Sequence, residues 1–296
     1  MSVDLQRIDA AAGAAAGADA AARSAGLVIR EIDDLTSLTG TAALFDRIWN
    51  NAAEEPLISI STLKAMAHAG SYVSAAFLDG TLVGGLIGFL GIRRGELQLH
   101  SHVLGVSPDV QDRSIGFALK LHQRAWSLER GITTVAWTFD PLVRRNAYFN
   151  VTKLGAAITA YYDRFYGDMS DGINVGDESD RVLVEWSLED ATVAERSRAH
   201  GADPDVDALR AGGAVVALEA DRAGEPVPGD GLGSGTMLVQ VPDDIVTLRA
   251  RDAGAALRWR RAVRETLGRA LDAGYVAGGM SRSGWYVLTS GSGERS

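Results

Sequence analysis

The chain has 296 residues, of which 46% are hydrophobic and 23% are charged, and its formal net charge is −9. This composition is typical of a soluble globular protein with one large or two ordinary domains, and the negative charge argues against nucleic acid or an anionic membrane surface as a partner. The absence of cysteine excludes disulfides, thiolate metal sites and a cysteinyl acyl-enzyme. No apolar segment reaches the length of a membrane span, so we expect a cytoplasmic protein.

The N-terminal residues 1–25 are rich in alanine and glycine. Residues 10–22 contain only alanine, glycine and one aspartate, and so lack the apolar core of a secretion signal. We expect these residues to form a disordered arm that is at most transiently helical.

From Leu27 to residue 188 the hydrophobic pattern changes repeatedly between strand and helix periods. It predicts strands over residues 27–32, 72–78, 81–90, 97–106, 133–139, 156–162 and 182–188, and helices over residues 44–49, 62–69, 114–130 and 143–154. Asp79-Gly80 is a strong signal for a two-residue turn, and Gly131 and Gly155 stand where helices end. The order of elements is β-α-α-β-β-β-α-β-α-β-β, with a long polar loop over residues 163–181 before the last strand.

A second unit, residues 214–296, follows a linker over residues 191–213 where charge, alanine and glycine dominate. Its pattern predicts a β-β-α-β-β order, with strands over residues 215–219, 237–241, 275–277 and 285–289 and a helix over residues 252–273. The arginines of that helix fit a helix covering a small sheet better than a nucleic-acid interface. About 80 residues are marginal for an independent core, so we expect this unit to dock on the first as a lid, a dimer element or an acceptor-site wall.

His100 and His102 precede the helix that begins near Ser114. Their spacing places both side chains on one face of a strand. The start of the helix, near Gly116, presents unpaired backbone N–H groups and the positive end of the helix dipole, which together form a site for an anion. An anion site beside titratable imidazoles suits transfer from a phosphate-bearing acyl donor, so the sequence indicates an enzyme.

These features resemble the GNAT superfamily of acyl-CoA-dependent N-acyltransferases over roughly residues 27–188. The superfamily's pyrophosphate motif, Gln/Arg-x-x-Gly-x-Gly/Ala, is matched by residues 111–116, with Ser114 in place of the first glycine. Further motifs look like a poorly characterised bacterial subgroup of predicted acetyltransferases: His-Ser-His-x-Leu-Gly-Val from His100, Trp137–Leu142, Asn146–Asn150 with Lys153–Ala156, and Ser179–Arg181. The resemblance implies an α/β fold with a mixed, mostly antiparallel sheet flanked by helices.

The resemblance also implies acetyl-CoA or another acyl-CoA as co-substrate. The turn into the helix would hold its phosphates, and the end of the preceding strand would polarise its thioester carbonyl. The implied cofactor-binding residues are Leu104, Gly105, Val106, Gln111, Asp112, Arg113, Ser114, Ile115, Gly116, Phe117 and Asn146. Gly105 has a second explanation, a bulge or a close backbone approach, and we expect Lys120 and Arg124 to solvate the helix surface.

His102 is the first choice for the base that deprotonates the amine, with His100 beside it. Both fall where arylalkylamine N-acetyltransferases of the superfamily carry a His-x-His used for this purpose. The alternative is that one or both histidines are core or sheet-surface residues. A metal site is less favoured because no third ligand is evident, and no metal is expected.

The general acid is less well defined by the resemblance. Many members carry a tyrosine where this chain has Val151, and Tyr148 lies one turn earlier. Tyr148 is therefore a candidate catalytic residue, although packing explains it equally well. A thiolate with a pKa near that of cysteine can also leave without an acid.

Arg144 and Arg145, in the first turn of their predicted helix, are candidates for binding a substrate carboxylate or a CoA phosphate, with plain surface exposure equally open. Tyr166, in the polar loop, is a further candidate for the acceptor site. Asp140 is expected to be a helix N-cap, and Trp137 is expected in the core.

Together these features predict transfer of an acetyl group, or another small acyl group such as succinyl, from CoA to a small-molecule amine. Two alternatives stay open: a non-catalytic acyl-CoA-binding regulatory module, and a structural partner protein that uses the C-terminal unit as an interface. The sequence names neither the acceptor nor the oligomeric state, for which a homodimer is one option.

Overall fold

The computed structural model describes residues 2–50, 56–110, 113–167, 178–199, 201–229, 231 and 235–290, without the side chains of residues 2–6. Within these ranges the chain divides into two compact units. The first contains the chain up to Trp137 together with Ser187–Arg198, and the second contains the other described residues from Thr138 onward. The boundaries of these units differ from the domain limits expected near residues 190 and 213. The reason is that residues after the expected linker contact residues that precede it.

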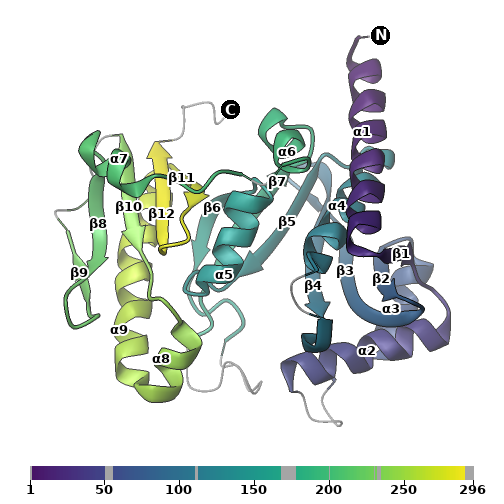
Figure 1. Ribbon diagram of the computed structural model, residues 1–296, viewed down its shortest axis with the longest axis horizontal. Coiled ribbons are helices and arrows are strands. Elements are labelled where there is room, and N and C mark those ends of the chain that lie inside the picture. Colours follow the sequence, from purple (N-terminus) through teal and green to yellow (C-terminus); the bar gives the residue numbers. More distant parts are fainter. Residues whose placement is uncertain are drawn as a thin grey trace. The chain divides into compact units, whose positions relative to one another are not determined.

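The first unit contains a sheet whose strands lie in the order β1-β2-β3-β4-β5 (Figure 1). Its strands are β1 (Leu27–Glu31), β2 (Tyr72–Leu78), β3 (Thr81–Arg93), β4 (Glu96–Val106) and β5 (Thr134–Phe139). Its helices are α1 (Ser2–Ala25), α2 (Leu35–Trp49), α3 (Ile60–His68), α4 (Ile115–Glu129) and α6 (Ala191–Arg196), with a 3-10 turn at Pro108–Val110. Neighbouring strands are antiparallel except for the parallel pair β4/β5.

Helices cover both faces of this sheet. On one face, α2 and α3 pack on β2, β3 and β4 through an apolar core that includes Leu38, Ala42, Phe45, Leu63, Val73, Ala75, Ile87 and Val103. On the other face α4 packs so closely that a Cβ atom at Gly84 would lie 3.1 Å from Leu119 Cδ1. The predicted fold class, an α/β fold with a mixed, mostly antiparallel sheet flanked by helices, is confirmed.

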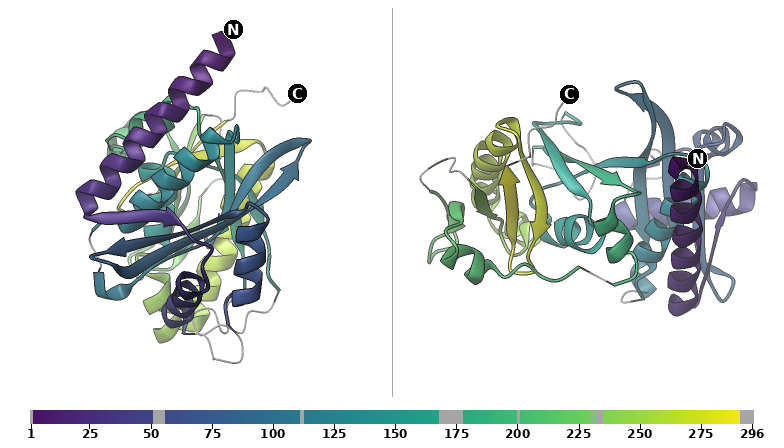
Figure 2. Two further views of the ribbon diagram at one scale, coloured as in Figure 1. Left: turned by 90° about the vertical axis from the view of Figure 1, so that its right-hand side faces the viewer. Right: turned by 90° about the horizontal axis from the view of Figure 1, so that it is seen from above.

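Residues 2–25 form one long helix, α1, so the expectation of a disordered arm is wrong. Figure 2 shows α1 in purple as a straight helix. It packs along α4, and Ala14 and Ala18, one turn apart, are only 3% and 5% exposed. Alanine has the highest helix propensity, and contact with α4 supplies the tertiary stabilisation that an isolated alanine-rich segment lacks.

The second unit contains a sheet whose strands lie in the order β7-β6-β11-β12-β10-β8-β9. Its strands are β6 (Ala157–Tyr162), β7 (Arg181–Ser187), β8 (Val215–Ala220), β9 (Pro226–Pro228), β10 (Thr236–Gln240), β11 (Tyr275–Met280) and β12 (Trp285–Ser290). Its helices are α5 (Arg144–Ala147), α7 (Val206–Ala211), α8 (Ile245–Arg251), α9 (Ala253–Val263) and α10 (Arg269–Asp272), with π-helical turns at Tyr148–Lys153 and Arg264–Gly268. Neighbouring strands are antiparallel except for the parallel pair β8/β10.

The C-terminal segment is part of this second sheet. Strand β11 pairs with β6 at Ala277 and Ile158. The Thr152 hydroxyl donates to the Met280 carbonyl at 2.6 Å and accepts from the Met280 N–H at 3.0 Å. Residues from β8 to β12 therefore share a sheet and a core with residues from the middle of the chain, and do not form the separate C-terminal unit that we expected.

The predicted elements between residues 27 and 188 are present in the predicted order. Strand β2 agrees with its prediction at both ends. The helix expected over residues 143–154 is α-helical only in α5 and then becomes π-helical, and the helix expected over residues 252–273 is divided into α9, a π-helical turn and α10. The short elements α6, α7, α8 and β9 were not predicted. Across the described part of the chain, no helix has the length and apolar character needed to cross a membrane.

Candidate functional site

Strands β4 and β5 pair only at the start of their parallel run. The described ladder between them ends at the pair His100–Ala136, and both strands continue beyond it. The described ladder between β4 and β5 has no further pair beyond this point, which leaves an opening between the two strands for an extended ligand. We call the start of this opening, at Ser101 of β4 and Trp137 of β5, the fork.

Strand β4 has a bulge at His102. Val103 pairs with Ile87 and Ser101 pairs with Gly88, so His102 is an extra residue without a partner in the ladder. A bulge changes the local alternation of side chains and turns one of them to a new direction. Sequence spacing alone did not predict this bulge.

The imidazoles of His100 and His102 lie on one face of β4, as predicted, together with the ring of Phe89 from β3. The Phe89 and His100 ring centroids are 4.9 Å apart in a stacked arrangement, the Phe89 and His102 centroids are 5.8 Å apart, and the two imidazole centroids are 6.2 Å apart. Phe89 and His102 are both exposed, so a small molecule can reach this aromatic group from solvent.

Both imidazoles are held toward their neutral form. Burial lowers the pKa of His100 to about 4, and the charges of His102 and Lys120 act in the same direction. Partial burial also lowers the pKa of His102. A neutral imidazole can accept a proton, so either ring is able to act as a base near neutral pH.

Lys120 of α4 lies on the opposite face of β4. Its side chain is buried, and its Nζ atom donates to Ser101 Oγ at 2.9 Å and to Gln123 Oε1 at 3.1 Å. The same ammonium lies 3.7 Å from the centroid of the Trp137 ring. Trp137 is buried, as expected, and Lys120 therefore contacts both sides of the fork.

Arg124, one turn along α4, is buried as well. Its Nε and NH2 groups both donate to the Leu188 carbonyl, at 3.0 and 2.7 Å. The expectation that Lys120 and Arg124 solvate the surface of this helix is therefore wrong. Their spacing is compatible with an exposed or a buried face, and only the packing of α4 on the sheet decides between the two.

The N-terminus of α4 begins with Ser114 in the left-handed region, at φ 55° and ψ 26°, and no side chain caps it. This conformation is one that glycine adopts readily, which explains how serine occupies the position where the superfamily motif has its first glycine. Ser114 and Arg113 are exposed, whereas Ile115 and Phe117 are buried. Gln111 and Asp112 lie outside the described residues.

Gly105, near the end of β4, is in close contact with α2. A Cβ atom at this position would lie 2.8 Å from Phe45 Cδ1 and 2.9 Å from Ile48 Cδ1. The close-approach explanation is therefore confirmed. The polarising role of the backbone around Leu104, Gly105 and Val106 stays a prediction.

Tyr148, the candidate acid, belongs to the second unit and is engaged there. Its hydroxyl accepts from Arg282 Nε at 3.1 Å, and the Arg282 guanidinium lies 5.3 Å from the centroid of its ring. Val151, at the superfamily's tyrosine position, is fully buried in the π-helical turn. The predicted role of Tyr148 is not tested by these contacts.

The other candidates of the second unit are differently placed. Arg144 NH1 donates to Asp243 Oδ1 at 2.7 Å, whereas Arg145 and Asn146 are exposed. Tyr166 is 45% exposed and its hydroxyl lies 3.4 Å from Thr138 Oγ1. Arg144 already has a carboxylate partner within the chain, which leaves Arg145 as the more accessible guanidinium.

Asp140 is not the helix N-cap that the sequence indicated, because α5 begins at Arg144 with Val143 as its N-cap. One Asp140 oxygen accepts from the Leu142 N–H, and both oxygens accept from Arg260 at 2.6 and 2.7 Å. Arg249 of α8 lies 3.7 Å from the same carboxylate. Asp140 and Arg260 are both buried, so they form a buried ion pair.

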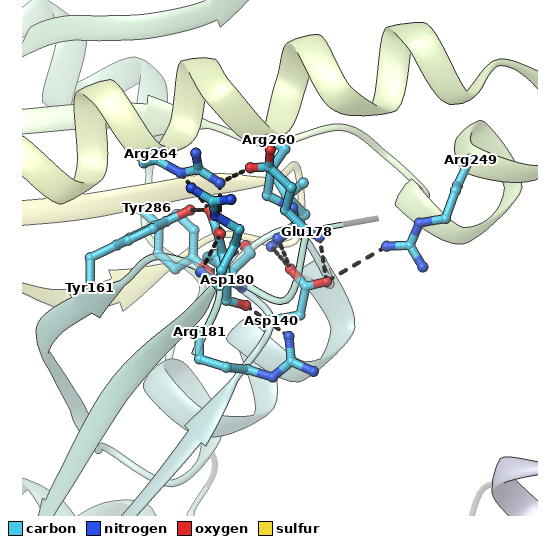
Figure 3. Close-up of polar contacts among 12 residues, drawn as sticks. Asp140, Tyr161, Glu178, Asp180, Arg181, Arg249, Arg260, Arg264 and Tyr286 are labelled. Carbon is cyan, nitrogen blue, oxygen red and sulfur yellow. Dashed lines mark hydrogen bonds and ion pairs between the residues drawn. The ribbon is translucent and has the colours of Figure 1, made fainter. Parts of the chain in front are cut away.

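A second group of charges lies next to this pair, around Asp180 (Figure 3). Arg264 donates to both Asp180 oxygens and to Glu178, and the Tyr161 hydroxyl donates to Asp180 at 2.7 Å. The sequence signal for these pairs was the spacing of four between Arg260 and Arg264, which places both on one face of a helix. That spacing could not show which acidic residues they meet.

Among the described residues, no group of three or more histidine, aspartate or glutamate side chains is arranged to hold a metal ion.

About half of the chain is similar in structure to solved acetyltransferases. The acetyltransferase of GNAT family from Streptococcus pneumoniae matches at 14% identity and a TM-score of 0.44, over 54% of this chain and 98% of that chain. The putative acetyltransferase yncA from Salmonella typhimurium, solved with acetyl-CoA, matches at 14% identity and a TM-score of 0.45, over 56% of this chain and 99% of that chain. The ribosomal-protein-S18-alanine N-acetyltransferase from Escherichia coli matches at 17% identity and a TM-score of 0.43, over 56% and 96%.

No protein-family model and no curated protein matches its sequence.

Proposed function

We propose that this chain is an N-acyltransferase that moves an acetyl or another small acyl group from CoA directly to a primary amine. The observation that carries the proposal is the end of the β4/β5 ladder at His100–Ala136, directly beside two imidazoles held toward the neutral form. An opening between parallel strands offers a backbone edge to an extended donor, and the imidazoles supply the base that the acceptor amine needs.

The donor's phosphates would bind at the N-terminus of α4. The left-handed Ser114 and the absence of a side-chain cap leave backbone N–H groups of the first turn available to an anion. Arg113, exposed beside this turn, would add a positive charge. The acyl group would then lie toward the fork, near Ser101 and His102.

His102 would take the proton of the attacking amine. It is exposed, whereas His100 is partly covered and stacked on Phe89. An ammonium acceptor must lose a proton before its nitrogen can attack a thioester, and a neutral imidazole within reach of solvent can accept that proton directly or through a water molecule. His100, whose lowered pKa keeps its imidazole neutral, would add no positive charge beside His102.

The acceptor would be a small polar amine, and the acyl group acetyl or a dicarboxylic group such as succinyl. The alternative function is a non-catalytic acyl-CoA-binding regulatory module. It is favoured by Val151, which cannot act as an acid, and by the engagement of Tyr148 with Arg282.

The experiment that tests the proposal is the thermal midpoint of the purified protein with acetyl-CoA, succinyl-CoA and free CoA. A ligand that binds only the folded state adds about 2.7 kcal/mol at 100 times its dissociation constant. We expect a clear rise that differs among the three donors. No rise with any of them would remove the acyltransferase and the acyl-CoA-binding module together, whereas a rise without turnover in an amine screen would favour the module.

A further inference from the structure

Lys120 is a buried lysine whose hydrogen-bond and ring contacts within the described part of the chain are Ser101, Gln123 and Trp137, without a carboxylate among them. Its side chain is 2% exposed. Burying an ammonium without a carboxylate is strongly unfavourable. A cation retained in such a place calls for an explanation beyond packing.

Arg124 shows how the same helix uses a buried cation for structure. Its Nε and NH2 groups both donate to the backbone carbonyl of the buried Leu188. Lys120 Nζ instead donates to two side chains, those of Ser101 and Gln123, and a hydroxyl and an amide can be replaced by apolar groups at little loss. The structural explanation that accounts for Arg124 therefore does not extend to Lys120.

The Gln123 side chain accepts a hydrogen bond from Lys120, while its own Nε2 group has no acceptor among the described residues. Its side chain is fully buried, and its Oε1 atom accepts from Lys120 Nζ at 3.1 Å. This orientation leaves Nε2 without a partner in the described part of the chain. An unpaired buried N–H is unfavourable by about 1–3 kcal/mol, so the interaction with Lys120 determines how this amide lies.

The position of Lys120 connects it to the fork. Ser101 follows the last β4 residue paired with β5, and Trp137 follows the last paired residue of β5. The ammonium is in contact with both, and so it lies at the closed end of the opening, on the α4 face. A thioester bound at the fork would place its sulfur and carbonyl close to the Ser101 hydroxyl.

We propose that the Ser101 hydroxyl, supplied with protons by Lys120, is the acid that protonates the thiolate leaving acyl-CoA. This inference rests on the proposed function. As the amine nitrogen bonds to the carbonyl carbon and the C–S bond breaks, the sulfur keeps the electron pair and takes the hydroxyl proton of Ser101, which takes a proton from Lys120. The amine's proton goes to His102, and Lys120 is then reprotonated from solvent.

Two further observations agree with this assignment. Burial lowers the pKa of Lys120, which makes its ammonium a stronger acid and brings its pKa toward that of a thiol. The superfamily's tyrosine position is occupied by Val151, which has no proton to give, and the candidate one turn earlier, Tyr148, is bound to Arg282. Lys120 acts through Ser101 and is therefore a positioning residue, whereas Ser101 would touch the donor.

The test compares the affinity of the full-length protein for CoA and for desulfo-CoA, in which hydrogen replaces the thiol. Wild type should bind CoA about tenfold more tightly at mildly alkaline pH, because the thiolate gains a charge-assisted hydrogen bond. Lys120→Met and Ser101→Ala should each lose that preference while their affinity for desulfo-CoA stays within about twofold of wild type. Lys64→Met, at an exposed lysine of α3, should keep the preference.

The ultraviolet absorbance of bound CoA at the same pH gives a second readout, because it reports the fraction present as thiolate. Wild type should raise this fraction above that of free CoA, and Lys120→Met should not; a purely structural lysine would leave it unchanged. If wild type, Lys120→Met and Ser101→Ala all prefer CoA over desulfo-CoA by the same factor, the inference is wrong and the proposed function still stands. Binding of neither ligand by wild type would overturn both. If Lys120→Met does not fold, the smaller change Ser101→Ala decides.

Discussion

At the scale of single residues, the two faces of β4 have different chemistry. His100 and His102 share one face with Phe89, while Ser101 turns to the other face and binds Lys120. Alternation along the strand places neighbouring side chains on opposite faces, and the ladder accommodates an extra residue at His102. The base and the acid of the proposed reaction would therefore come from adjacent residues of one strand.

Replacing His102 by alanine should reduce kcat/KM by about 10²–10⁴-fold with an accepted amine, because the base is lost. The affinity for CoA should change by less than about twofold, since His102 is not part of the phosphate site. Because partial burial lowers the pKa of His102 below its ordinary value of 6.5, the decrease of wild-type kcat/KM toward acid pH should have its midpoint below pH 6.5. A midpoint above pH 6.5 would contradict this role.

His100 should make stability depend on pH. Its folded pKa of about 4 lies below the ordinary value of 6.5, so the neutral form favours folding above pH 6.5 and this contribution is lost as the pH falls toward 4. Relative to His100→Asn, the free energy of unfolding of wild type should fall by about 2 kcal/mol over that range, reduced by partial exposure. Urea unfolding at pH 6.5 and at pH 4 measures this change in the free energy of unfolding. His68→Asn, at an exposed histidine of α3, is the control and should follow wild type.

At the scale of elements, α2 lies unusually close to β3 and β4. Glycine at positions 85 and 105 makes this possible, because a Cβ at either would meet Thr41 or Phe45 at 2.8 Å. The same approach holds the end of β4, which carries the backbone groups proposed to polarise the thioester. The packing of α2 on β4 and the proposed thioester-binding end of β4 therefore both depend on Gly105.

Gly105→Ala should lower the free energy of unfolding by about 1–3 kcal/mol, because the methyl group overlaps Phe45 and α2 must move. Gly91→Ala is the matched control, since it lies in β3 with no atom within 4 Å of an added Cβ; it should change stability by less than about 0.5 kcal/mol. Urea unfolding of both variants provides the comparison. Equal free energies of unfolding of the two variants would show that α2 can move away from the added methyl group without a loss of stability.

At the scale of the whole molecule, the C-terminal segment completes a sheet and a charge cluster in the second unit. Strand β11 pairs with β6, and Arg260 and Arg264 neutralise Asp140 and Asp180. The segment is thus an integral part of that unit. The arginines at positions 260 and 264 of this segment therefore have acidic partners within the unit.

Asp140→Asn should lower the free energy of unfolding by about 3–5 kcal/mol, because it removes the negative charge from a buried ion pair with Arg260. Glu225→Gln is the control, because its pair with Arg258 is solvent-exposed and similarly short at 2.6 Å; it should change stability by less than about 1 kcal/mol. Thermal and urea unfolding measure both. A double variant with Arg260→Met should recover part of the loss, and its failure to do so would argue against the pairing as the cause.

The sequence by itself determined the elements between residues 27 and 188, and their order. These depend on local signals, namely hydrophobic period and the glycines at turns, such as Gly80, Gly131 and Gly155, all at positive φ. It also placed the two imidazoles on one face, because that follows from strand geometry.

Only the tertiary structure decided which charged residues are buried and what they meet. Lys120 and Arg124 occupy a helix face whose partner is a sheet formed by distant strands, and Asp140 meets Arg260 across 120 positions of sequence. The helix over residues 2–25 likewise depends on α4 for its packing. Such contacts join residues that no local pattern relates, and burial of a charge is decided by the whole environment that surrounds it.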